Sequence, residues 1–372
     1  MPTPLRPTYV EVNLSCLATN LQAIRRKVAP ARVMPVVKAN AYGHGLVPVA
    51  KHLLAHEADA LGVAILDEGI ILRQAGITAP VLVLGGIQPE QVEAYLQHSL
   101  TLTVTSPENL QPIEQAAERL GVTAAVHVKV DTGMRRLGVP YTEADRLLGA
   151  CLELPHVRLE GVFSHFANAD AADLRDARRQ LERFQLALGF FERHGVPRPL
   201  IHMANSGAIL QLPESYFDLV RPGIMLYGVY PSPQAQRTVK VTPALTWKTR
   251  PVLIKILPPH SPVSYGSTWQ CDHAVRLLTL PLGYGDGYFR RLSNRGVVLV
   301  HGKRYPVVGR VCMDQVLVNL ENDAADTMDE VVLLGEQDRA VITADELAEL
   351  AGTIAYEILT NISARVPRVY VE

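Results

Sequence analysis

Short apolar runs alternate with longer amphipathic stretches through the first two thirds of the chain. The runs have the length and composition of buried strands, and they lie at residues 32–40, 58–65, 80–86, 100–106, 123–131, 157–165, 199–206 and 217–224. The stretches between them, such as residues 107–121 and 173–195, repeat apolar residues at helical spacing. Strand–helix units in series predict a (β/α)8 TIM barrel. A doubly wound sheet is the alternative fold, but no Gly-x-Gly-x-x-Gly motif follows the first predicted strand.

The pattern changes after residue 235. Strand-like segments are predicted at residues 250–258, 276–285, 296–320 and 330–336, and helices only at residues 343–352 and 354–363. The sequence therefore predicts a barrel domain over residues 9–235 and a smaller, mostly β C-terminal domain over residues 236–372. The Pro-containing stretch 230–243 is the expected boundary. Residues 1–8 and part of the first strand are candidates to pack with the second domain.

The composition narrows the class of function. The chain has 36 basic and 37 acidic residues, and its net charge of −1 offers no electrostatic footprint for nucleic acid or an anionic membrane. The four cysteines contain no Cys-x-x-Cys pair, which argues against disulfides or a zinc site and favours a reducing compartment. The N-terminus lacks the apolar core of a signal peptide, and no apolar run reaches the roughly 18 residues of a membrane-spanning helix. We expect a cytoplasmic protein that acts on a small molecule and needs no metal.

The fifth predicted strand, at residues 123–131, carries polar side chains at alternate positions. Valines occupy the positions between His127, Lys129 and Asp131. Because side chains alternate across a strand, the valines should face the helices and the three polar residues should point into the barrel. An edge strand facing solvent is the alternative. Arg136 follows in the adjoining loop and could neutralise a carboxylate.

Lys38 lies at the end of the first predicted strand, where barrel enzymes place catalytic groups. It is followed by the loop 42–45, which begins with Tyr42 and contains two glycines that allow the backbone to approach a ligand. A lysine held among apolar neighbours loses basicity, which suits covalent binding of an aldehyde cofactor. A solvated surface lysine is the alternative.

The ends of strands six to eight carry further candidates. They are His165, Asn205, Ser206 and Arg221. Each alone could be structural, but together they would converge on one barrel mouth. Ser206, Gly223 and Ile224 are also placed to offer hydroxyl and backbone N–H groups to a phosphate, as barrels often do after strands seven and eight.

The second domain supplies a separate set of candidates. They are Tyr265 in the segment SPVSYGSTW, Tyr284 and Asp286 in PLGYGDGY, and Cys312, Met313 and Asp314 in VGRVCMDQV. The GYGDGY segment could equally be a turn with aromatic packing. Cys312 is expected to be buried or to line a pocket rather than to act as a nucleophile, because no histidine accompanies it in its segment.

Taken together, the motifs resemble those of the alanine racemase family over essentially the whole chain. The matching stretches are VVKANAYGHG, KVDTGMRRLG, SHFANAD, HMANSG, RPGIMLYG, VSYGSTW, GYGDGY, GRVCMDQ and AYEILTNISARVPRVY, in the family's order. The first motif alone would also admit pyridoxal-phosphate barrels such as basic amino-acid decarboxylases, and the tyrosine motifs favour racemases. One departure is Arg135, where the family usually has a small residue.

The resemblance implies a role for each candidate. Lys38 would bind pyridoxal 5'-phosphate covalently, and Tyr265 from a partner subunit would be the opposing acid–base group. Arg221 would contact the pyridine nitrogen and His165 would stack on the ring. The remaining cofactor contacts would come from Tyr42, Asn205, Ser206, Gly223, Ile224 and Tyr356. Arg136 and Met313 would lie near the substrate carboxylate, Lys129 would be carbamylated, and Tyr284 would constrict the entrance.

The activity implied by the resemblance is interconversion of L- and D-alanine by a homodimer, which would supply D-alanine for peptidoglycan. A broad-specificity amino-acid racemase is the nearest alternative. A decarboxylase on the same scaffold and a non-enzymatic pyridoxal-phosphate carrier are more distant ones, and residues 236–372 argue against the carrier, which lacks a second domain.

Overall fold

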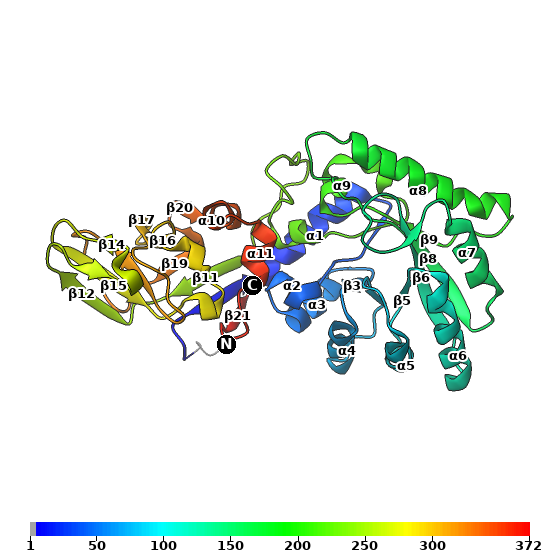
Figure 1. Cartoon of the computed structure of the whole chain (residues 1–372), viewed down its shortest axis with the longest axis horizontal. Coiled ribbons are helices and arrows are strands. Elements are labelled where there is room, and N and C mark those ends of the chain that lie inside the picture. The colour runs from blue at the N-terminus through cyan, green and yellow to red at the C-terminus, as the bar shows by residue number, and fades with distance from the viewer. Residues whose placement is uncertain (1–4) are drawn as a thin grey trace. The chain divides into compact units, whose positions relative to one another are not determined.

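The computed structural model describes residues 5–372 and divides into two compact units (Figure 1). The barrel unit comprises residues 17–41 and 46–241. The β unit comprises the described residues up to Cys16, the short segment Tyr42–Gly45, and Thr242–Glu372. The segment Tyr42–Gly45 is thus flanked on both sides by barrel sequence and yet belongs to the other unit.

The barrel unit is built on eight parallel strands. They are β2 (Arg32–Val33), β3 (Leu61–Val63), β4 (Val81–Val83), β5 (Leu102–Val104), β6 (Ala124–Asp131), β8 (Val157–Phe163), β9 (Leu200–His202) and β10 (Leu219–Val220). Six of them form a sheet in the order β2-β10-β9-β8-β6-β5, and β3 pairs with β4. Bridges from Val36 to Gly62 and from Leu82 to Thr101 join β3 and β4 to the rest and close the ring. The predicted (β/α)8 barrel is confirmed.

Helices cover the outside of the barrel strands, as Figure 1 shows for α4 to α8. The helices are α1 (Leu14–Val28), α3 (Leu46–Ala55), α4 (Leu66–Gln74), α5 (Val92–Gln97), α6 (Leu110–Leu120), α7 (Ala144–Glu153), α8 (Arg175–Arg193) and α9 (Ser206–Gln211). In α6 the buried residues Leu110, Ile113 and Ala117 recur at helical spacing, and Gly121 (φ 66°) ends the helix. Full burial of one such aliphatic side chain stabilises the fold by about 1.5–3 kcal/mol.

The β unit consists mainly of antiparallel strands. They are β1 (Tyr9–Asn13), β11 (Leu245–Thr249), β12 (Leu253–Leu257), β13 (Pro262–Val263), β14 (Trp269–Gln270), β15 (Val275–Leu280), β16 (Val297–Val300), β17 (Lys303–Pro306), β18 (Val316–Asn319), β19 (Val331–Gln337), β20 (Ala340–Ile342) and β21 (Arg368–Val371). The largest sheet runs β17-β16-β19-β11-β1-β21, with β20 added to β19. Helices α10 (Ala344–Ala351) and α11 (Ala355–Thr360) complete the unit. The predicted mostly β C-terminal region is confirmed.

Strand β1 comes from the N-terminal end of the chain but is part of this β sheet. It pairs antiparallel with β11 and parallel with β21, so that Val10 lies opposite both Trp247 and Arg368. Val10 and Trp247 are buried, and they help to form the core of the sheet.

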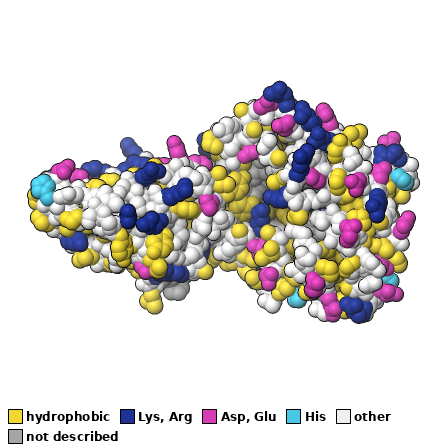
Figure 2. Space-filling view, viewed as in Figure 1, with side chains coloured by type: hydrophobic (Ala, Val, Ile, Leu, Met, Phe, Trp, Pro, Cys, Tyr) yellow, Lys and Arg dark blue, Asp and Glu magenta, His cyan; other side chains and the backbone are white. Residues whose placement is uncertain are grey.

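On the face shown in Figure 2, basic and acidic side chains are interspersed, in keeping with the net charge of −1. Among residues 5–372, no helix has both the length and the apolar character that crossing a membrane would require.

Candidate functional site

Lys38 begins a short segment with an unusual backbone, labelled α2 (Lys38–Tyr42) in Figure 1. Ala39, Asn40 and Ala41 have φ between 53° and 55° and ψ between 44° and 53°, and Tyr42 has a φ of 51°. These are left-handed helical angles, which cost an L-residue roughly 1–2 kcal/mol each. The segment, called the Lys38 turn below, therefore persists only because its surroundings hold it.

Two hydrogen bonds stabilise the Lys38 turn. The Ala39 N–H donates to Glu68 Oε1 at 2.6 Å, and the Leu46 N–H donates to Asn40 Oδ1 at 2.9 Å. Lys38 itself is half-buried. Burial lowers the pKa of its amine, Arg136 lowers that pKa further and Glu68 opposes the shift. A lowered pKa leaves more of the amine unprotonated, which is the nucleophilic form.

Lys129, on β6, is buried, and among residues 5–372 no acid forms an ion pair with it. Its side chain is 5% exposed, and its Nζ lies 5.4 Å from the centre of the Phe163 ring. Burial lowers its pKa to about 8, with further contributions from the positive charges of Arg136, Arg221 and Lys38.

Asp131 raises the pKa of Lys129 only as the smallest contribution, because its carboxylate is engaged elsewhere. Asp131 Oδ1 accepts from the N–H groups of Gly133 and Arg135 at 2.9 and 3.0 Å. An Asp131–Lys129 ion pair is therefore not formed. The turn that Asp131 caps places Arg135 at a φ of 56°, so the residue that departs from the family pattern also has a left-handed backbone.

Arg221 lies 3% exposed at the end of β10 and bonds to several groups in the barrel. Its Nη2 donates to the carbonyls of Ser164 and Met203 at 2.7 and 3.0 Å and lies 3.4 Å from His165 Nδ1. Its Nη1 contacts His202 Nδ1. Burial lowers the pKa of Arg221 to about 9.

A chain of histidines extends from Arg221 across the barrel. His202 Nε2 lies 2.8 Å from His127 Nδ1. Arginine can only donate, so His202 Nδ1 must accept and His202 Nε2 must carry the proton given to His127. Burial lowers the pKa of His127 to about 3, and burial and Arg221 hold the pKa values of His165 and His202 well below their usual range. All three rings are neutral near pH 7.

Three of the candidate phosphate-binding residues, Ser206, Gly223 and Ile224, follow β9 and β10. Ser206 Oγ accepts from the N–H groups of Gly223 and Met225 at 3.0 and 3.4 Å. Ile224 begins the next short 3-10 helix, Ile224–Tyr227. Asn205 instead caps α9, because its Oδ1 accepts from the Ala208 N–H at 3.1 Å.

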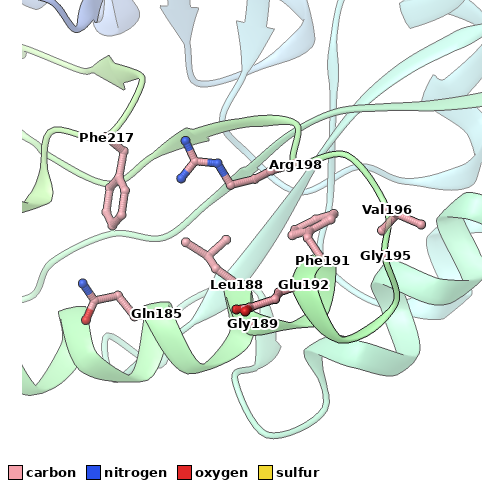
Figure 3. A pocket seen from close by; sticks show the side chains of 9 residues that line it. All are labelled: Gln185, Leu188, Gly189, Phe191, Glu192, Gly195, Val196, Arg198 and Phe217. Atoms are coloured by element: carbon pink, nitrogen blue, oxygen red, sulfur yellow. The ribbon is translucent and has the colours of Figure 1, made fainter.

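A small hollow of about 10 Å³ lies at the ends of β6 and β8 and the segments that follow them. It is lined by Lys129, Val130, Asp131, Met134, Arg136, Leu137, Ser164 and His165. A much larger hollow of about 580 Å³ lies beside α8 and contains none of the predicted residues (Figure 3). Phe191 and Phe217 contribute apolar surface to it, and Arg198 and Glu192 contribute charge. Size alone therefore does not locate the candidate site.

In the β unit, Tyr265 is carried on a second strained turn. Its side chain is 71% exposed. Ser264 has a φ of 63° with a ψ of −176°, and Ser267 has a φ of 47°. The Ser264 hydroxyl donates to the Arg310 carbonyl at 2.6 Å and lies 3.5 Å from Cys312 Sγ. We call residues 264–267 the Tyr265 turn.

Tyr284 and Met313 are also exposed, at 43% and 52%, and their loops are joined. The Tyr284 N–H donates to the Cys312 carbonyl at 3.0 Å, and the Gly285 N–H donates to the Met313 carbonyl at 2.9 Å. Asp286, two residues after Tyr284, is fully buried and forms ion pairs with Arg6 at 2.8 Å and Arg365 at 3.6 Å.

Tyr42 and Tyr356 lie near each other in the β unit, with ring centres 6.2 Å apart. The glycines that follow Tyr42 are closely enclosed: a Cβ on Gly43 would lie 2.2 Å from the Leu359 carbonyl oxygen, and a Cβ on Gly45 would meet the Tyr370 hydroxyl. Arg368 Nε donates to the Gly43 carbonyl at 3.0 Å.

Sequence reasoning did not identify every residue that supports these groups. It missed Glu68, Ser264, Arg310 and Arg368. Each of them forms a hydrogen bond that involves a backbone atom of a residue distant in sequence. No pattern of residue spacing predicts such a bond. Among residues 5–372, no group of three His, Cys, Asp or Glu side chains could hold a metal ion.

The fold and the site together define a class of protein. This is an α/β barrel protein with a second, mostly β unit, and the barrel interior holds buried cations suited to a small anionic ligand. A family model described as alanine racemase, N-terminal domain, matches residues 12–231, and one described as alanine racemase, C-terminal domain, matches residues 244–370. The chain belongs to the alanine racemase family.

Individual relatives agree with this assignment. The alanine racemase of Carboxydothermus hydrogenoformans is 51% identical over 369 residues, covering 99% of this chain and all of the relative. That of Symbiobacterium thermophilum is 47% identical, covering 98% of this chain and 97% of the relative. The solved structure of alanine racemase from Streptomyces lavendulae has a TM-score of 0.95 at 38% identity, covering 100% of this chain and 98% of that one. A histidine racemase from Leuconostoc mesenteroides also matches, with a TM-score of 0.91 at 28% identity over 100% of this chain and 99% of that one.

Proposed function

We propose that this protein interconverts L- and D-alanine with pyridoxal 5'-phosphate as cofactor. Family membership carries the proposal, because the named relatives match over nearly their full length and at up to 51% identity. In the proposed division of labour, residues 9–235 bind the cofactor and residues 236–372 supply groups that complete the site.

The donor set of the barrel fits this cofactor. Four cations lie near one another: Arg136, Arg221 and Lys38 each lower the pKa of Lys129, and Arg136 also lowers that of Lys38. The nearby acids Glu68 and Asp131 are bonded to backbone N–H groups. Buried cations without paired acids are costly. A phosphate and a substrate carboxylate would supply the missing negative charge.

The residues would hold the cofactor at four points. Lys38 Nζ would bind its aldehyde, and Arg221, whose guanidinium is already oriented by Ser164 and Met203, would meet the pyridine nitrogen. His165 would stack on the ring. The phosphate would be bound by Ser206, Gly223, Ile224, Tyr42 and Tyr356, while Asn205 would act by capping the helix that carries Ser206.

Racemisation requires proton transfer on both faces of the substrate Cα. When bound, pyridoxal phosphate withdraws electrons from that carbon and makes its proton acidic. Lys38 Nζ would accept or donate the proton on one face, and Tyr265 Oη from a partner subunit would do so on the other. Arg136 and Met313 would bind near the substrate carboxylate, and Tyr284 would narrow the entrance. Arg221 would leave the pyridine nitrogen unprotonated, since arginine gives up a proton poorly.

Lys129 would act through Arg136. A cationic Lys129 would repel Arg136, whereas a carbamylated Lys129 would be a planar anion that accepts two hydrogen bonds from a guanidinium. The lowered pKa of Lys129, about 8, favours the modification because carbon dioxide reacts with the unprotonated amine. Carbamylated Lys129 would then hold Arg136 in position for the substrate.

One assay tests the activity and its alternatives. The protein is incubated with L-alanine in deuterated water, and optical rotation, deuterium at Cα and carbon dioxide are followed. We expect loss of rotation with deuterium uptake and no gas. Gas release would indicate a decarboxylase, and neither change would indicate a non-enzymatic carrier. Because a histidine racemase shares this fold, L-histidine is included, and faster turnover of histidine would replace alanine as the proposed substrate. A cytoplasmic role in supplying D-alanine for peptidoglycan is tested by deleting the gene and restoring growth with D-alanine.

A further inference from the structure

The Lys38 turn is held from a different part of the barrel. Glu68 lies in the first turn of α4, which follows β3, whereas Lys38 follows β2. Its two carboxylate oxygens reach two backbone N–H groups: Oε1 accepts from Ala39 at 2.6 Å, and Oε2 accepts from Ala64 at 2.8 Å. One carboxylate therefore joins the segments that follow two neighbouring barrel strands.

The two hydrogen bonds of Glu68 have different structural roles. The bond to Ala64 is local, four residues away, and is the kind that caps the start of a helix. The bond to Ala39 spans 29 residues and fixes the first residue of the left-handed run. Helix capping alone explains only the first bond. The second is available because the left-handed angles of Ala39 leave its N–H out of any right-handed helix.

We propose that Glu68 is a positioning residue that holds the Lys38 turn in its left-handed conformation and so orients Lys38. The inference rests on the proposed function, in which Lys38 binds the cofactor. Without the Ala39 bond, residues 39–42 would relax towards ordinary backbone angles, and the Lys38 side chain would lose its defined direction. Glu68 also places a negative charge near the Lys38 amine, where it opposes the effects of burial and Arg136.

The first test measures cofactor binding to the apoenzyme. Glu68→Gln keeps the shape of the side chain but replaces one acceptor oxygen with a donor, which cannot face an N–H group. We expect the dissociation constant for pyridoxal phosphate, followed by fluorescence, to rise about 10-fold or more. Asp67→Asn is the matched control, since it removes an exposed acid from the same helical turn. It should leave the dissociation constant unchanged.

The second test measures the ionisation of Lys38. Apoenzyme is treated with pyridoxal phosphate and borohydride over a range of pH, and the label on Lys38 is quantified by peptide mapping. Removing the negative charge of Glu68 disfavours the ammonium form, so labelling in Glu68→Gln should reach its midpoint at a lower pH than in the wild type. A residue that only capped α4 would lower the melting temperature without raising the dissociation constant of the first test.

The third test relieves the strain directly. Glycine adopts left-handed angles at little cost, so Ala39→Gly in the Glu68→Gln background should regain most of the lost affinity. The pH midpoint should stay shifted, because the charge is still absent. If Glu68→Gln does not fold, Glu68→Asp replaces it: the shorter acid keeps the charge and should lose affinity without the midpoint shift.

The outcomes separate the two proposals. Wild-type affinity and midpoint in Glu68→Gln, or no recovery with Ala39→Gly, would overturn the role of Glu68. Absence of any Lys38 label in the wild-type protein would instead overturn the proposed function.

Discussion

The Lys38 turn and the Tyr265 turn carry the two proposed acid–base groups, and both contain left-handed backbone. They differ in what holds them. The Lys38 turn is bonded to a carboxylate, Glu68, and its lysine is half-buried among other cations. The Tyr265 turn is held by a neutral hydroxyl, that of Ser264, and its tyrosine is 71% exposed.

This difference separates two ways of preparing a reactive group. Burial and nearby charge tune Lys38, so its chemistry is set within one chain. The side chain of Tyr265 is 71% exposed, and the bond from Ser264 holds only the backbone turn that carries it. Under the proposed function its chemical environment would come from a partner subunit, whereas that of Lys38 would not.

The largest expected effect comes from removing Lys38. Lys38→Ala should abolish the borohydride-dependent pyridoxyl label and reduce racemisation in both directions by about 10⁴-fold or more, because both the cofactor link and one base are lost. Rates with each enantiomer and peptide mapping measure this. Lys51→Ala, an exposed lysine on α3, is the control and should behave as wild type. A label on a lysine other than Lys38 would contradict the assignment.

Tyr265→Ala should have a smaller and asymmetric effect. We expect the cofactor label to persist and racemisation to fall by roughly 10²- to 10⁴-fold, because one general acid–base group is lost. The primary deuterium isotope effects measured with labelled L- and D-alanine should become unequal. Near-normal rates in both directions would exclude Tyr265 from proton transfer.

Mixing the Lys38→Ala and Tyr265→Ala proteins tests the partner subunit. A hybrid dimer would contain one site with both groups intact, so partial activity should return. No recovery after verified subunit exchange would count against a shared site.

Substitutions at Ser264 test the orientation of the Tyr265 turn while leaving the tyrosine hydroxyl in place. Ser264→Ala removes the bond to Arg310 and should slow proton transfer on the tyrosine face by about 10- to 100-fold, since small displacements of a reacting group are costly. Ser264→Gly should melt at a higher temperature than Ser264→Ala, because glycine tolerates the φ of 63°, yet remain slow. Ser261→Ala, which removes a bond of the same length to the Pro258 carbonyl, is the control. Full activity in Ser264→Gly would show that the hydroxyl is not needed.

Lys129→Ala should have the smallest effect on the rate of racemisation. It tests a buried residue that would act on the site only through Arg136. We expect a loss of about 10-fold, as for other residues that orient a ligand-binding group. Chloride or acetate should restore part of it by occupying the vacant anion site. The carbamylated fraction of wild-type Lys129, measured by intact mass, should rise with pH through about 8, because only the unprotonated amine reacts. Unmodified Lys129 in fully active protein under ample carbon dioxide would refute the role.

The sequence predicted the barrel because its alternation of strands and helices follows from local periodicity. The alternation at β6 placed His127 and Lys129 away from the helices, and the structure has both buried, with His127 bonded to His202 inside the barrel. Arg221 directly follows β10, as predicted, but β2 ends at Val33, so Lys38 lies five residues beyond its strand rather than at its end. Such patterns repeat every two residues and need no knowledge of distant contacts.

The features that the sequence did not predict depend on long-range or competing bonds. Residues 38–42 contain alanines, which ordinarily favour right-handed helix, and their left-handed angles involve Glu68, 29 residues away. Asp131 lies two residues from Lys129 on the same strand and could pair with it, but two nearby N–H groups compete for its carboxylate. The parallel pairing of β1 with β21 joins the two ends of the chain, which no local pattern indicates.

The enclosure of Gly43 has a consequence for protein engineering. Arg368 donates to the Gly43 carbonyl and also to the carbonyls of Ile362, Ser363 and Val366, so the glycine loop and the C-terminal segment form one structural module. In a chimaera that joined this barrel to the C-terminal region of a homologue, residues 42–45 would pack against a C-terminal segment whose contacts with them differ. Recombination should therefore transplant the N-terminal residues up to Cys16 and residues 42–45 together with residues 242–372, even though barrel sequence lies on both sides of residues 42–45.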